Sequence, residues 1–215
     1  VHQVVLTQTA IAHSLVPFAI YAAAMAAIFE EGGRYLAFRT ILKNRTPRKE
    51  EALMAGAGHG GMEVLLIFTV GMVVNLYYAL VLYRGGGASL LGTMGGEVPS
   101  LAETIFSALT YTAPLAFLVG LFERMVAMVL HLSFALFVWL SVQQKRKMYL
   151  GISLGIHFVV DFVAVLLSRS GVSILLIELV VALMAAGAFY WALQESRRWE
   201  AVENKEATAD LLPID

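Results

Sequence analysis

The sequence predicts an all-α fold, a multi-spanning transmembrane helical bundle. Of the 215 residues, 59% are hydrophobic and only 14% are charged, whereas a soluble domain carries about 25% charged residues. The mean hydropathy is +0.75, and several apolar stretches are long enough to cross a bilayer. The formal net charge of −1 indicates no basic groove for nucleic acid. The absence of cysteine excludes disulfides and thiolate nucleophiles.

Five segments are predicted to cross the membrane, at about 11–29, 53–82, 114–141, 148–168 and 172–193. The first lies in a longer helix that projects past the bilayer, and Pro47 stops the chain from continuing as helix in the loop that follows. The second ends at the glycines 85–87, and Pro114 opens the third. A tight basic loop at 145–147 leads into the fourth, and a turn at Gly171 leads into the fifth.

The remaining residues are assigned to the membrane surface. Residues 100–110 resemble the capped start of a short amphipathic helix. Residues 200–215 form a charged tail after a transmembrane domain at 1–199. Basic residues cluster between the first two spans, in the loop at 145–147 and after the last span. By the positive-inside rule, these two loops and the C-terminus face the cytoplasm.

Ionisable side chains mark four of the spans, where charge is costly and usually functional. They are Glu30, Glu31 and Arg34 on the first, His59 and Glu63 on the second, Glu123, Arg124 and His131 on the third, and His157 and Asp161 on the fourth. Counted from the nearest cytoplasmic basic residue, one group on each helix lies 9 to 14 residues deep, or about 13–21 Å along a helix. Four ionisable groups at nearly one level predict a shared polar cavity open to the cytoplasm.

Spacing within the helices favours particular pairings. His59 and Glu63 are four residues apart, as are His157 and Asp161, so each carboxylate can orient its imidazole. Arg34 lies one turn after Glu30, so these two side chains can also pair.

Two features admit more than one interpretation. Glu123 and Arg124 are consistent with a structural ion pair alone. The glycines at 56, 58, 60 and 61 are as consistent with close helix packing as with a substrate groove.

Gly32 and Gly33 remove side chains beside the acids, so a backbone or a substrate can approach there.

The adjacent acids and the histidines point to hydrolysis. The sequence has no serine with a matched base, no His-Glu-x-x-His zinc motif and no phosphate-binding loop. A carboxylate in a low-dielectric pocket can activate water as a general base. Glu30 is the leading base, and Glu31 assists it or pairs with Arg34. A second set, His59, His131 and His157, would polarise the substrate carbonyl and stabilise the oxyanion.

These motifs resemble those of the YhfC family of bacterial membrane proteins, in the superfamily of glutamic-type intramembrane proteases with the CAAX prenyl proteases and PrsW. The stretch from Glu30 to Arg34 resembles the paired-glutamate motif, and His59 to Glu63 resembles the Gly-His-Gly-Gly-x-Glu motif. Glu123 to His131 and His157 to Asp161 resemble the third and fourth motifs. In the CAAX proteases the arginine follows the second glutamate by four positions, and here by three.

The resemblance implies an intramembrane endopeptidase of a bacterial or archaeal cytoplasmic membrane, acting on a peptide or membrane protein. The later spans also resemble the Aph scaffold subunit of γ-secretase, so a non-catalytic assembly subunit is the rival interpretation. A proton-coupled transporter is a third interpretation, which the lack of an internal repeat disfavours. The paired acids favour the enzyme, since a scaffold needs no second acid. The partners are the lipid bilayer and the substrate, with a homo-oligomer or an assembly partner left open.

No cofactor is expected. Histidine ligands on one helix usually come as an i,i+4 pair, and here a carboxylate or an apolar residue takes that place. We therefore expect no stoichiometric zinc and activity that survives chelation. The alternative is a zinc site made by His59, His131 and His157.

Overall fold

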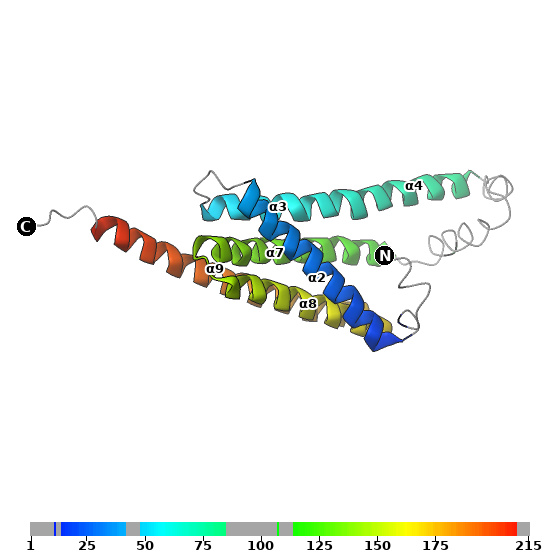
Figure 1. The fold of residues 1–215 in the computed structure, drawn as a ribbon. Coiled ribbons are helices and arrows are strands. Elements are labelled where there is room, and N and C mark those ends of the chain that lie inside the picture. Colours follow the sequence, from blue (N-terminus) through cyan, green and yellow to red (C-terminus); the bar gives the residue numbers. More distant parts are fainter. Residues whose placement is uncertain (1–10, 12–13, 42–47, 85–106, 108–113, 210–215) are drawn as a thin grey trace, which may run out of the picture. The chain divides into compact units, whose positions relative to one another are not determined.

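The computed structural model describes residues 11, 14–41, 48–84, 107 and 114–209. Its elements are all helices (Figure 1). They are α2 (Leu15–Thr40), α3 (Lys49–Glu63), η2 (Val64–Thr69), α4 (Val70–Tyr83), α7 (Pro114–Gln143), α8 (Lys147–Arg169) and α9 (Ile174–Ala209). Five helical stretches are long and apolar enough to span a membrane. The predicted all-α, multi-spanning fold is therefore confirmed.

The helices overlap the predicted spans. α2 and α9 begin at Leu15 and Ile174, after the predicted starts at 11 and 172, and several helices extend past the predicted ends. α2 continues to Thr40, in agreement with the predicted longer helix that projects past the first span, so the paired acids lie within the helix. α3 and α4 are joined without a break by η2, a π-helical turn, and such turns occur often at functional sites. α9 continues to Ala209, so the first part of the predicted charged tail is helical. Apart from Ser107, the predicted amphipathic helix at 100–110 lies outside the described residues.

The chain divides into two compact units, which are described separately. The first comprises residues 1–60 and 126–215, and the second comprises residues 61–125. The divisions fall inside α3 and α7. In the first unit, α2 packs against α8, and α8 also packs against α9.

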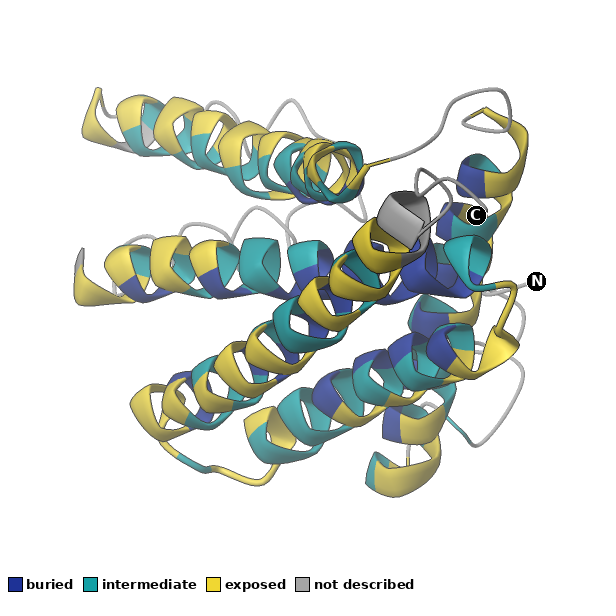
Figure 2. Cartoon of the chain, turned by 90° about the vertical axis from the view of Figure 1, so that its left-hand side faces the viewer, coloured by how far each residue is buried: buried dark blue, intermediate teal, exposed yellow. Residues whose placement is uncertain are grey.

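The C-terminal half of α7 supplies the core of the first unit. Every residue from Ser133 to Ser141 is buried, as expected for a helix that is apolar on all sides. Phe137 and Leu140 are fully buried there, in a cluster that includes Phe38 of α2. Figure 2 shows buried residues along one side of most helices and exposed residues along the other. Many of the exposed residues are large and apolar, which suits a surface that faces lipid.

Two glycines allow α3 to approach α7 closely. A Cβ atom added at Gly56 would meet the carbonyl oxygen of His131 at 2.8 Å and the Cβ of Ala135 at 2.9 Å. One added at Gly60 would meet the His131 ring at 3.0 Å. Gly58 has no atom within 4 Å of its Cβ position. Of the two interpretations left open for these glycines, close packing therefore holds for Gly56 and Gly60.

Replacing Gly56 with alanine is expected to lower the free energy of unfolding by about 1–3 kcal/mol, because the added methyl group overlaps the backbone of α7. Gly58→Ala is the matched control. It lies on the same helix, meets nothing, and should raise stability by up to about 1 kcal/mol through helix propensity. Thermal unfolding in detergent measures both variants. Equal melting temperatures for the two would contradict a packing role for Gly56.

Candidate functional site

Glu31 is the polar centre of the first unit. Its side chain is fully buried on α2, and its carboxylate accepts hydrogen bonds from Arg34, Ser153 and His157. The Ser153 hydroxyl donates at 2.6 Å and the His157 Nδ1 at 3.0 Å, both from α8. Buried charged groups persist where they are paired and hydrogen-bonded. With three donors around it, Glu31 is suited to hold other side chains in place.

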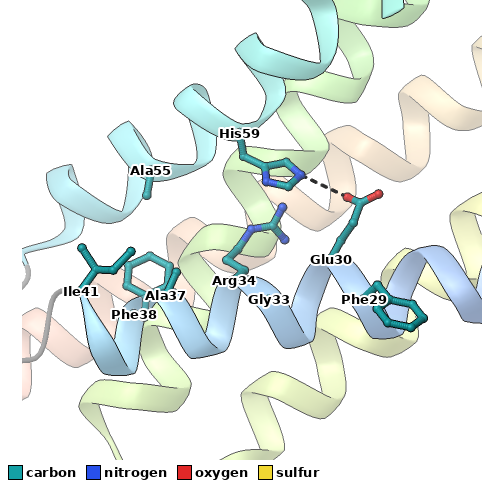
Figure 3. Close-up of a pocket in the computed structure, with 9 residues that line it drawn as sticks. All are labelled: Phe29, Glu30, Gly33, Arg34, Ala37, Phe38, Ile41, Ala55 and His59. Carbon is teal, nitrogen blue, oxygen red and sulfur yellow. Dashed lines mark ion pairs between the residues drawn. The ribbon is translucent and has the colours of Figure 1, made fainter. Parts of the chain in front are cut away.

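The side chain of Glu30 points in a different direction from that of Glu31, since neighbouring side chains are about 100° apart around an α-helix. Its side chain is 33% exposed, and its Oε2 atom lies 3.3 Å from Nε2 of His59 on α3 and 4.0 Å from Nε2 of His157. Figure 3 shows Glu30 and His59 facing each other from α2 and α3. Oε2 itself is buried and makes no aligned hydrogen bond with any residue in the described ranges. Such an acceptor is available to a ligand.

Hydrogen bonds assign the protons on two histidines. His157 donates from Nδ1 to Glu31, so its Nε2 atom faces Glu30 and Asp161, the latter at 3.4 Å. His131 Nδ1 lies 3.1 Å from Nη2 of Arg34. A guanidinium group only donates, so His131 Nδ1 accepts, and the neutral ring carries its proton on Nε2. Arg34 thus fixes the tautomer of the neutral His131 ring, and Glu31 fixes the Nδ1 proton of His157.

Ring contacts also fix the histidines. The His157 ring stacks on Phe134 of α7 with centroids 4.7 Å apart and planes at 6°. The His59 and His131 rings lie 4.8 Å apart, across the close approach that Gly56 and Gly60 allow. The structure therefore brings together seven of the predicted residues: Glu30, Glu31, Arg34, His59, His131, His157 and Asp161.

The other three predicted residues form a cluster within the second unit. Arg124 donates to Glu63 at 2.7 Å and also pairs with Glu123. The orientation of His59 by Glu63 stays a prediction. Nε2 of His59 lies 3.3 Å from Oε2 of Glu30, a partner on another helix that spacing within one helix does not indicate. The predicted pairing of His157 with Asp161 agrees with the structure, and Arg34 pairs with Glu31 rather than with Glu30.

Sequence reasoning missed Ser153 and Phe134. Ser153 stands four residues before His157, which stands four before Asp161. The three therefore share one face of α8, and this spacing was visible in the sequence. Phe134 had no comparable signal, because it is one of many apolar residues in α7.

The groups around Glu30 fit a divalent metal ion. Glu30, His59 and His131 each offer a ligand atom, and these atoms lie within 4.8 Å of one another. Two ligands of a tetrahedral zinc lie about 3.3 Å apart, given bonds of about 2.0–2.1 Å. Glu30 Oε2 and His59 Nε2 already have this separation of 3.3 Å. His131 completes the set, and its Nδ1 atom also contacts Nη2 of Arg34 at 3.1 Å.

This ligand set differs from the three-histidine set expected from the sequence, because Glu30 takes the place of His157. His157 Nε2 is 4.0 Å from Glu30 Oε2, but His157 is not among the three residues whose ligand atoms converge in the described chain. Its Nε2 atom is instead placed between two carboxylates, a position suited to moving a proton.

Comparison with known proteins agrees with a metal site. A family model described as YhfC intramembrane metalloprotease matches residues 1–183. The "Uncharacterized membrane protein YhfC" of Bacillus subtilis (strain 168) is 33% identical over 193 residues, which are 89% of this chain and 73% of that protein. No solved structure matches the chain. The family description and the convergent ligand atoms do not support the expectation that the protein works without a metal.

Proposed function

The chain belongs to the YhfC intramembrane metalloprotease family, and from this premise we propose that it is an integral membrane peptidase. We propose further that Glu30, His59 and His131 hold its metal. Two imidazoles and a carboxylate are ligands typical of catalytic zinc. The observation that carries the proposal is the convergence of one ligand atom each from Glu30, His59 and His131, all within 4.8 Å of one another.

The side chains beside the three proposed metal ligands have separate roles in hydrolysis. Bound zinc would supply a Lewis acid for the peptide carbonyl and activate water. His157 Nε2 accepts the proton of the attacking water while the water oxygen bonds to the carbonyl carbon. The same atom then gives that proton to the amine nitrogen as the carbon–nitrogen bond breaks. Asp161, 3.4 Å from Nε2, stabilises the imidazolium between the two transfers.

Glu31 acts in this scheme as a positioning residue. Its hydrogen bond to His157 Nδ1 keeps Nε2 as the atom that exchanges protons with the site. Ser153 and Arg34 fix the carboxylate of Glu31 in turn. The substrate would be a peptide or a membrane protein, and we place the basic loop at 145–147 and the C-terminus on the cytoplasmic side.

Two other functions remain testable against this one. In a glutamic mechanism Glu30 itself would activate water, with no metal. In a scaffold, the network around Glu31 would join α2, α7 and α8, and Glu30 would have no task. Cleavage of a fluorescence-quenched peptide with an apolar centre by purified protein, with its metal content measured in parallel, separates the three.

Substitutions of the two buried histidines, His131 and His157, are expected to have different effects on zinc binding and on cleavage. His131→Gln should lose both zinc and cleavage, because it removes a ligand. His157→Gln should keep zinc but lower kcat by about 10²–10⁴-fold, the usual contribution of acid–base catalysis. Elemental analysis and peptide cleavage measure the two properties, and thermal unfolding checks the fold. Zinc lost from the His157 variant and kept by the His131 variant would restore His157 to the ligand set.

A further inference from the structure

A mainly apolar pocket begins at the Glu30–His59 pair. Its volume is about 530 Å³, within the range of roughly 300–1,000 Å³ typical of ligand pockets. Glu30, Arg34 and His59 are its polar lining residues. The rest of the lining is apolar and follows α2 as far as Ile41, with Ala55 contributed by α3 (Figure 3).

The dimensions and the polar groups of the pocket suit a peptide. From Glu30 to Ile41, α2 rises about 16 Å at 1.5 Å per residue, which equals roughly five residues of extended chain. Arg34 adds a specific polar contact. Its side chain is 4% exposed, and its Nε atom is buried without a hydrogen-bond partner among the residues that the structure describes. Arg34 contributes its guanidinium to the lining, and because this group only donates hydrogen bonds, it suits a main-chain carbonyl of a peptide better than the hydrocarbon part of an acyl chain.

Gly33 lies in the wall of this pocket, and its missing side chain leaves space. A Cβ atom added there would meet nothing within 4 Å, so the glycine is not required for helix packing. Gly32 also meets nothing within 4 Å, but it is not among the residues that line the pocket. Both glycines thus have free space at the Cβ position, but only Gly33 lines the pocket.

We propose that the pocket binds the apolar residues of the peptide substrate beside the scissile bond, and that Gly33 keeps it open. The inference rests on the proposed peptidase function, since it assigns a substrate-binding role next to the proposed metal ligands. It also names the substrate class: an extended peptide segment of about five residues whose side chains are apolar.

Matched leucine variants test the proposal. Gly33→Leu should lower kcat/KM for a quenched peptide with an apolar centre by tenfold or more, mainly through a higher KM. Gly32→Leu should stay within twofold of wild type. Both variants gain the same helix propensity, and both should bind zinc as wild type does. Wild type should also prefer this peptide over one in which serines replace the apolar residues.

A binding measurement keeps the test independent of catalysis. The same peptide carrying a photoactivatable phenylalanine should crosslink to Phe38 or Ile41 in the Glu30→Gln protein, and Gly33→Leu should remove the crosslink while Gly32→Leu retains it. Crosslinks at the pocket without any cleavage by wild type would refute the peptidase function alone. Cleavage without these crosslinks, equal effects of the two leucines, or labelling by a photoactivatable acyl lipid in place of the peptide would overturn the pocket proposal.

Discussion

Glu30→Gln is expected to abolish peptide cleavage and leave the fold intact, whereas Glu31→Gln is expected to destabilise the protein. In zinc-free protein, replacing Glu30 should change the free energy of unfolding by no more than about 1 kcal/mol, the most that a partly exposed ion pair such as Glu30–His59 contributes. Glu31 is fully buried and pairs with Arg34. Removing its charge leaves a buried guanidinium unpaired, which costs about 3–5 kcal/mol.

The two variants are chemically identical substitutions at adjacent positions, so each is the control for the other. Thermal unfolding in detergent gives the stabilities, and cleavage of the quenched peptide gives the activities. For Glu30→Gln we expect a fall in kcat of about 10²–10⁴-fold or more. Loss of stability in Glu31→Gln alone, together with no cleavage by wild type, would favour the scaffold. A stable Glu30→Gln protein with full activity would remove this residue from the mechanism.

Chelation is expected to remove zinc and activity together, and added zinc is expected to restore both. The reason is the convergence of ligand atoms from α2, α3 and α7, since each of these helices contributes one group to a site that needs about three. Zinc at 100 times its Kd should also stabilise the folded protein by about 2.7 kcal/mol. The melting temperature of the chelated protein should therefore rise when zinc is added back.

The Glu30→Gln protein provides the control, because its melting temperature should not respond to zinc at the same concentration. Zinc bound only weakly at the surface would shift wild type and variant alike. Full cleavage by protein that contains no zinc, before and after chelation, would falsify the metal-dependent scheme. Glu30 would then be the base that activates water.

The fold could be predicted because its signals are local. Each apolar run is as long as a membrane span, and Pro114, the basic loop at 145–147 and Gly171 mark the connections. Residue counts predicted that groups on four helices would meet, because a helix rises by a constant amount per residue, and Glu30, His59, His131 and His157 do lie in one site. The end of α9 was less predictable, since polar residues can continue a helix outside the bilayer as well as end it.

The division of roles within the site could not be predicted, because it depends on contacts between helices. Nothing in the pair Glu30–Glu31 shows which acid turns toward Ser153 and which toward His59. The expectation of no metal followed from a rule about two ligands on one helix, whereas here each converging ligand comes from a different helix. The packing role of Gly56 likewise became evident only when α7 was in place.

The ion pair between Glu31 and Arg34 has a consequence for biosynthesis. Both residues belong to α2 and are three positions apart, so they can neutralise each other as soon as this helix forms. A single Arg or Asp at the centre of a span raises the free energy of membrane insertion by about 2.5–3.5 kcal/mol. The nascent α2 can thus enter the bilayer with its two most costly charges already joined. Ser153 and His157 are synthesised later, and they take up the remaining acceptor capacity of Glu31 when α8 inserts.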